Sequence, residues 1–265
     1  MKAFGNLVAG AALALLPSLA AAQNILIVNG SSGTSEPGTT SLITSNLKTL
    51  HEAVGNIVTV VSDIPADFSG FAQIWDIRFD DTFALTAGQQ MSYLGYLQGG
   101  GRMFLMGEND SFTARNNSIF SFIAAAGGGT VGFNESCAST QTAQAPFNGP
   151  NVVSSFGYFA PGCFDGTGTG QWITNSSPTS GAGVAWTTGT LANASAGALT
   201  SILDVNFMEG DVGDDSQNLT KNLIGFVNNP LPPPNVIPEP STYVLMATGF
   251  AGLLALRRRR TSSKV

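Results

Sequence analysis

Short apolar runs that alternate with segments of helical periodicity constrain the fold of this chain more than any other feature. Five runs predict strands, at residues 24–29, 57–61, 72–77, 103–106 and 130–133. Between them, apolar residues recur at helical spacing, with Thr86 placed to begin a helix and Gly127 to end one. Strands that alternate with helices in this way predict a doubly wound, mainly parallel α/β sheet.

The first 22 residues have the form of a secretory signal peptide. Lys2 supplies a positive charge, residues 7–16 are apolar, and Ala20 and Ala22 make an A-x-A pattern before Gln23. Small residues at these positions are typical of signal-peptidase sites. We therefore expect export by the Sec machinery, with cleavage between Ala22 and Gln23.

The C-terminal segment, residues 238–265, combines three features in a fixed order. It opens with Pro238, Glu239 and Pro240, which cannot continue a helix. Residues 243–256 are then uncharged, and as a helix they would rise about 21 Å, less than a hydrocarbon core of about 30 Å. Four arginines follow: Arg257, Arg258, Arg259 and Arg260. Such a cluster is expected to stay cytoplasmic and to leave the rest of the chain outside.

This tail resembles the PEP-CTERM sorting signal of Gram-negative bacteria. The resemblance is carried by residues 236–242, the apolar span and the arginine cluster. It implies processing near Pro-Glu-Pro by an exosortase, a membrane cysteine transpeptidase. It also implies transient anchoring by a transmembrane helix at residues 243–256, then a place at the cell surface or outside the cell, and a connection with biofilm or exopolysaccharide.

Between the two end segments lies a markedly acidic domain. Of the 11 basic and 17 acidic residues in the chain, residues 23–237 keep 5 and 16, a net charge near −11. This charge argues against nucleic acid or anionic lipid as a partner and permits cations or neutral polymers. Since His51 is the only histidine, a Cys–His nucleophile pair or a Cys/His zinc site is not expected.

The composition changes after residue 133. Residues 134–190 are rich in Gly, Ser, Thr and Asn, and predict an antiparallel, β-rich insertion. Cys137 and Cys163 lie within it and are expected to form a disulfide, since exported cysteine pairs are more often bridged than free. The predicted organisation is a signal peptide (1–22), an α/β domain (23–133), the insertion (134–190), the last strand and helix of the domain (191–229), a proline-rich linker (230–237) and the sorting signal (238–265).

The order of motifs in residues 24–133 resembles class I glutamine-amidotransferase-like domains of flavodoxin-like topology. The resemblance is carried by ILIVNG, by IWDIRFDD with its acidic end, and by the GGG and GEND motifs further along. Active members of that family place a nucleophilic cysteine on the sharp turn after a central strand. The matching turn here is residues 107–110, which holds no cysteine, and no histidine follows it. Amidotransferase activity is therefore not expected, and the chain is predicted not to be an enzyme.

Polar side chains are expected to gather at one edge of the sheet. In an open parallel sheet, ligands bind outside the carboxyl ends of the strands. Carboxylate and amide oxygens there suit Ca²⁺, and paired carboxylates suit acid–base chemistry on a sugar. The residues expected at this edge are Asn29, Asp76, Asp80, Asp81, Glu108, Asn109, Asp110, Asn206, Glu209 and Asp211.

The sequence leaves three functions open. The prediction is a non-catalytic surface or matrix protein, with no cofactor. The first alternative is a Ca²⁺- or exopolysaccharide-binding module that uses the acidic edge. The second is a hydrolase that uses carboxylates such as Asp76 and Glu108, and it requires Asp76, Glu108 and Glu209 to share one cleft. A simpler explanation also stands, because Asp, Asn and Gly are the residues that turns and helix caps require.

Overall fold

The apolar runs form strands of a nine-stranded mixed sheet in the computed structural model, which describes residues 22–210 and 213–228. Neighbouring strands in the first half of the sheet are parallel, in the order β2-β1-β3-β4-β9. This is the strand order of flavodoxin-like sheets, with β9 in the fifth place. The strands are β1 (Asn24–Val28), β2 (Ile57–Val61), β3 (Gln73–Asp76), β4 (Arg102–Gly107) and β9 (Ala198–Leu203).

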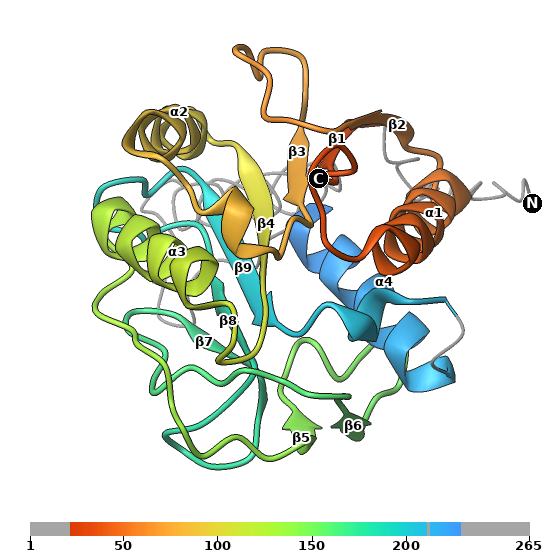
Figure 1. Ribbon diagram of the computed structural model, residues 1–265, viewed down its shortest axis with the longest axis vertical. Helices are drawn as coiled ribbons and strands as arrows, with labels where there is room; N and C mark the ends of the chain where they lie inside the picture. Colours follow the sequence, from red (N-terminus) through yellow and green to blue (C-terminus); the bar gives the residue numbers. More distant parts are fainter. Residues whose placement is uncertain (1–21, 211–212, 229–265) are drawn as a thin grey trace, which may run out of the picture.

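The β-rich segment continues this sheet beyond β9 with antiparallel strands. They are β5 (Thr140–Ala143), β6 (Ser155–Gly157), β7 (Gln171–Asn175) and β8 (Gly183–Trp186), and β6 forms the far edge. The segment therefore extends the main sheet and does not form a layer of its own (Figure 1). Its predicted disulfide is confirmed, with 2.03 Å between the Sγ atoms of Cys137 and Cys163.

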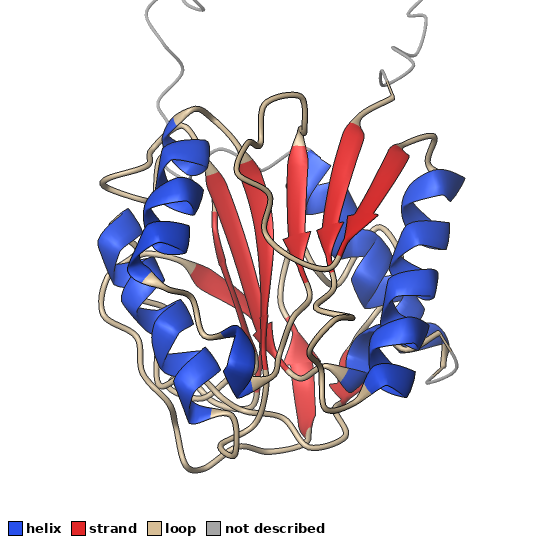
Figure 2. Ribbon diagram, turned by 45° about the horizontal axis from the view of Figure 1, so that its top comes forward, coloured by secondary structure: helices blue, strands red, loops and turns tan. Residues whose placement is uncertain are grey.

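Helices cover both faces of the sheet (Figure 2). One face is covered by α1 (Pro37–Ala53) and α4 (Asp214–Asn228), and the other by α2 (Ala87–Gln98) and α3 (Thr113–Ala126). Two short 3₁₀ helices, η1 (Asp81–Phe83) and η2 (Asn206–Met208), follow β3 and β9. The helix ends agree with the sequence, since Thr86 forms a capping box with Gln89 and Gly127 ends α3 at a φ of 84°.

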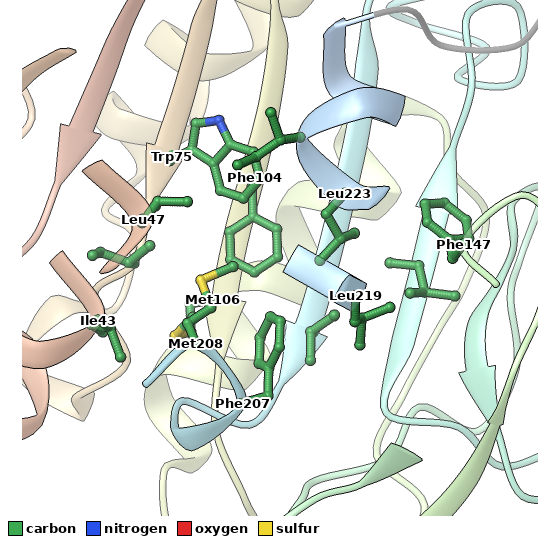
Figure 3. Packing of buried hydrophobic residues seen from close by; sticks show 14 of the residues in the cluster. Ile43, Leu47, Trp75, Phe104, Met106, Phe147, Phe207, Met208, Leu219 and Leu223 are labelled. Atoms are coloured by element: carbon green, nitrogen blue, oxygen red, sulfur yellow. The ribbon is translucent and has the colours of Figure 1, made fainter. Parts of the chain in front are cut away.

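Each face of the sheet has its own hydrophobic core. Between the sheet and α1 and α4, Trp75 stacks on Phe104 at 5.0 Å, and Leu219 and Leu223 of α4 belong to the same core (Figure 3). The second core holds Leu26, Leu105, Tyr93 and Ile123 beneath α2 and α3. Full burial of one such side chain stabilises a fold by about 1.5–3 kcal/mol. Both cores fix the strand ends whose side chains form the candidate site.

The prediction of a strand at residues 130–133 is wrong. Phe133 forms only an isolated bridge with Phe164, and the segment before it bonds to a loop. Thr169 N–H donates to Gly128 O at 2.9 Å, and Asp165 N–H donates to Gly132 O at 3.1 Å. The loop satisfies these backbone groups, and β9 takes the fifth place in the parallel sheet.

Two predictions concern the ends of the chain. Among the residues that the structure describes, no helix is long and apolar enough to cross a membrane. The predicted helix at residues 243–256 lies outside the described residues, as do residues 1–21 of the predicted signal peptide and the linker and sorting signal after residue 228.

Candidate functional site

The turn after β4 brings Glu108 to the carboxyl edge of the sheet. Asn116, near the start of α3, holds this turn: its Oδ1 accepts from Glu108 N–H at 3.0 Å, and its Nδ2 donates to the carbonyls of Glu108 and Asn109 at 2.7 and 3.0 Å. At Gly107 a Cβ would lie 2.4 Å from Leu203 Cδ2 and 2.6 Å from Asn116 Oδ1, so any larger residue would displace the side chains that hold this turn. The turn is thus packed tightly between β9 and α3.

Glu108 forms a buried acidic pair with Asp204, which directly follows β9. Both Glu108 oxygens accept backbone N–H groups, from Asn109 at 3.0 Å and from Val205 at 2.7 Å. Asp204 accepts from Phe207 N–H at 3.0 Å and from Phe159 N–H at 3.2 Å. Burial and the charge of Asp204 raise the pKa of Glu108 to about 8, and burial raises the pKa of Asp204 to about 6. The pair is therefore expected to hold a proton at neutral pH.

Asp76, at the end of β3, lies in a buried ion cluster. Its carboxylate accepts from Arg78 Nε and Nη2 at 2.8 and 2.7 Å and from the Tyr93 hydroxyl at 3.0 Å. Arg115 Nη2 lies 3.3 Å from Asp76 Oδ2, as an ion pair without hydrogen-bond geometry. Burial raises the pKa of Asp76, but the charges of Arg115 and Arg78 outweigh this effect and hold it at about 2. Since Asp76 is fully buried, its carboxylate is not accessible to a ligand.

The loops after β1 and β3 are joined over the point where the strand order reverses. Asp80 Oδ2 accepts from Ser35 N–H at 2.8 Å, and Asp81 Oδ1 accepts from Arg115 N–H at 2.9 Å. Asn29 Oδ1 accepts from Ser31 N–H at 3.1 Å within its own loop. These side chains therefore hold the loops that close over the edge.

Three of the remaining predicted residues, Asn206, Glu209 and Asn109, have local partners. Glu209 Oε1 accepts from Asn206 Nδ2 at 3.1 Å, and Asn109 Oδ1 accepts from Ser111 N–H at 3.0 Å. Asp110 is exposed, and Asp211 lies outside the described residues. Within residues 22–210 and 213–228, no group of three or more His, Cys, Asp and Glu side chains is placed to hold a metal ion.

The sequence prediction missed the acid that does lie beside Glu108. Asp204 stands at the end of the apolar run that becomes β9, so its position after a strand was the available signal. The arginine partners of Asp76 were missed too, because Arg115 reaches the cluster from a helix far along the chain. The site therefore contains a buried Glu108–Asp204 pair and, separately, a sealed Asp76 cluster.

Solved structures share this fold at low sequence identity. The mmIFT52 N-terminal domain matches with a TM-score of 0.55 and 11% identity, over 77% of this chain and 96% of that one. A ThuA-like protein from Bacteroides uniformis matches with a TM-score of 0.53 and 13% identity, over 78% of this chain and 91% of that one. At these identities the matches show the fold alone. None of the curated protein sequences compared with the chain matches it.

The C-terminal segment matches a known sorting motif. Residues 236–260 match the model of the PEP-CTERM protein-sorting motif. The chain is therefore an exported protein that carries a PEP-CTERM signal, with an exosortase as its processing partner. The fold defines a mixed α/β domain, and the motif defines how that domain is sorted.

Proposed function

We propose that the chain is a non-catalytic protein of the cell surface or extracellular matrix, displayed after an exosortase processes its tail. The observation that carries this proposal is the sorting motif at residues 236–260, which follows a folded domain that ends at Asn228. Its connection with biofilm and exopolysaccharide belongs to the same proposal.

The side chains at the carboxyl edge support a role without catalysis. Asp76 is held by Arg78, Arg115 and Tyr93, and Glu108 bonds two backbone N–H groups. A general base must reach the proton that it abstracts, and a nucleophile needs an accessible atom with an activating group beside it. The turn that would carry the nucleophile of an amidotransferase holds Glu108 and Asn109 instead.

The route of the chain supports display of the carboxyl edge. Gln73, the first residue of β3, donates through Nε2 to Gln23 Oε1 at 2.9 Å and also to Asn228 Oδ1. The two ends of the folded domain are thus joined at the amino edge of the parallel strands. The sorting signal follows Asn228, so the opposite edge, with Glu108 and Asp204, would face away from the attachment point.

A glycan-binding module is the second candidate, favoured by one exposed aromatic residue. The Phe159 side chain is 83% exposed, and its backbone N–H bonds Asp204 at the carboxyl edge. An exposed aromatic ring offers an apolar face against which a sugar ring can stack. Calorimetry with the host exopolysaccharide, with and without Ca²⁺, tests this candidate. Binding heat in the wild type that disappears in Phe159→Ala would support glycan binding. If the wild type gives no binding heat, glycan binding is excluded and surface display remains as the proposed function.

Processing of altered tails tests the main proposal. Replacing Pro238, Glu239 and Pro240 together by alanine is expected to stop processing and to leave the unprocessed chain in the membrane fraction. The matched control replaces three linker residues outside the motif, Pro232, Pro233 and Pro234, by alanine and is expected to be processed. The proposal is wrong if the first variant matures like the wild type.

A further inference from the structure

Among the residues that the structure describes, strand β2 is an edge strand without the usual protection against pairing. It is bonded to β1 on one side, and no described strand pairs with its other side (Figure 1). Its sequence, IVTVV, contains no charge and no proline, and Ile57 and Val60 are 61% and 38% exposed. Edge strands are normally protected by lysine, proline, bulges or a covering element. An unprotected edge of this kind is suited to pairing with another strand.

The outward-facing backbone groups of β2 belong to two valines. Ile57 N–H donates to Gln23 O at 2.8 Å, and Val61 O accepts from Asn29 N–H at 2.9 Å, so both residues bond towards β1. Because bonding direction alternates along a strand, the N–H and C=O groups of Val58 and Val60 point away from β1. These two residues are the ones that a further strand would bond.

We infer that β2 pairs with β2 of a second copy of this chain, antiparallel, about a twofold axis at Thr59. In this register Val58 lies opposite Val60 of the second copy, and the reverse pair is equivalent. Each pair exchanges two hydrogen bonds, and Thr59 lies opposite its own counterpart in a non-bonded pair. The outward-facing residues are therefore self-complementary, as an isologous dimer contact requires.

Local charge does not oppose a second copy at this edge. The exported part is acidic, yet β2 holds no ionisable residue, so two paired copies of this strand bring no charges of their own together. The first acidic residue after the strand, Asp63, would lie opposite Gly55 of the second copy, so no like charges meet. Five residues a side make a small contact, below about 1,200 Å², and such contacts are weak and concentration-dependent.

Single cysteine substitutions test the register directly, because both native cysteines are already bridged to each other. Thr59→Cys in the exported protein is expected to give a disulfide-linked dimer on mild oxidation, since Cα atoms of a non-bonded antiparallel pair lie about 4.5 Å apart. The control is Ile57→Cys, whose two copies would be about 13 Å apart in this register. Because Ile57 is 61% exposed, cross-links that arise from random collision would form in this control as readily as in Thr59→Cys, so a difference between the two variants reports the register. Equal cross-linking of both variants, or none in Thr59→Cys, would overturn the inference.

Sedimentation provides a second test without cross-linking. Val60→Pro removes an N–H that faces solvent in the single copy, and edge strands tolerate proline there. The variant is expected to keep the wild-type circular dichroism while its dimer dissociates at least about tenfold more readily, because two intermolecular hydrogen bonds are lost. Val60→Thr, which keeps the N–H, should dimerise like the wild type. A wild type that stays monomeric at all concentrations, or a Val60→Pro protein that dimerises unchanged, contradicts the pairing.

Discussion

The carboxylate of Asp76 lies fully buried between the guanidinium groups of Arg78 and Arg115 and the hydroxyl of Tyr93. At the residue level, this cluster gives Asp76 a structural role. A strand-end aspartate suits a ligand site, but the charges of two buried arginines also need a counter-charge. Asp76 therefore serves the fold, and Glu108 and Asp204 are the edge carboxylates whose pKa values are raised.

Removing the charge of Asp76 tests this structural role. Asp76→Asn leaves Arg78 and Arg115 buried beside a neutral amide, so the free energy of unfolding is expected to fall by about 3–5 kcal/mol. Denaturant titration measures the change. Glu52→Gln is the control, since it breaks an exposed pair with Lys48 and should cost less than about 0.5 kcal/mol. Equal stability of Asp76→Asn and the wild type would show that the cluster is not needed.

His51 makes the stability of the domain depend on pH. It is fully buried against Trp75, and burial lowers its pKa from 6.5 to about 4. The unfolded chain then binds a proton more readily than the folded one, so stability is lost as pH falls from about 6.5 towards 4. The shift corresponds to roughly 3 kcal/mol.

The comparison of wild type with His51→Gln isolates this effect. Glu108 and Asp204 also titrate, but they are present in both proteins and cancel in the difference. Between pH 7 and pH 4 the wild type should lose stability relative to the variant, as followed by thermal unfolding across that range. Parallel stability profiles for the two proteins would rule out His51 as the source.

At the level of elements, the connection from β4 to α3 shapes the candidate site. Asn116 holds the turn with three hydrogen bonds and is itself buried. Asn116→Ala would leave a buried N–H and two carbonyls without these partners, at an expected cost of about 3 kcal/mol. Its exposed neighbour on the same helix is the control, and Asn117→Ala should change the midpoint of urea unfolding little. A similar midpoint for both variants would show that other contacts hold the turn.

The elements that the sequence predicts well are those with strong local signals. The apolar runs of β1, β2 and β4 and the capping residue Thr86 act through neighbours in the sequence. The strand expected at residues 130–133 fails because its backbone bonds are made with a loop more than 30 residues away. At the carboxyl edge, nearby partners such as Arg78 for Asp76 are within reach of local pattern, but Arg115 of α3 and Val205 after β9 come from elements far along the chain. Local pattern therefore predicts elements, and long-range bonding decides which side chains remain free.

At the level of the whole molecule, the two ends of the folded domain meet at the amino edge through Gln73. The segment between Asn228 and Pro238 can span at most about 36 Å when fully extended. The amino edge is thus kept near the processing site, and the carboxyl edge is free to face outwards. This arrangement fits a displayed domain, and it leaves the edge strand β2 accessible for pairing between copies.

The intact mass of the exported protein tests the central claim, sorting through the C-terminal signal, most directly. Mass spectrometry of the protein recovered from the cell surface or the medium should give a chain that begins at Gln23 and has lost Arg257–Arg260. A mature protein that retains the four arginines would contradict processing of the PEP-CTERM signal.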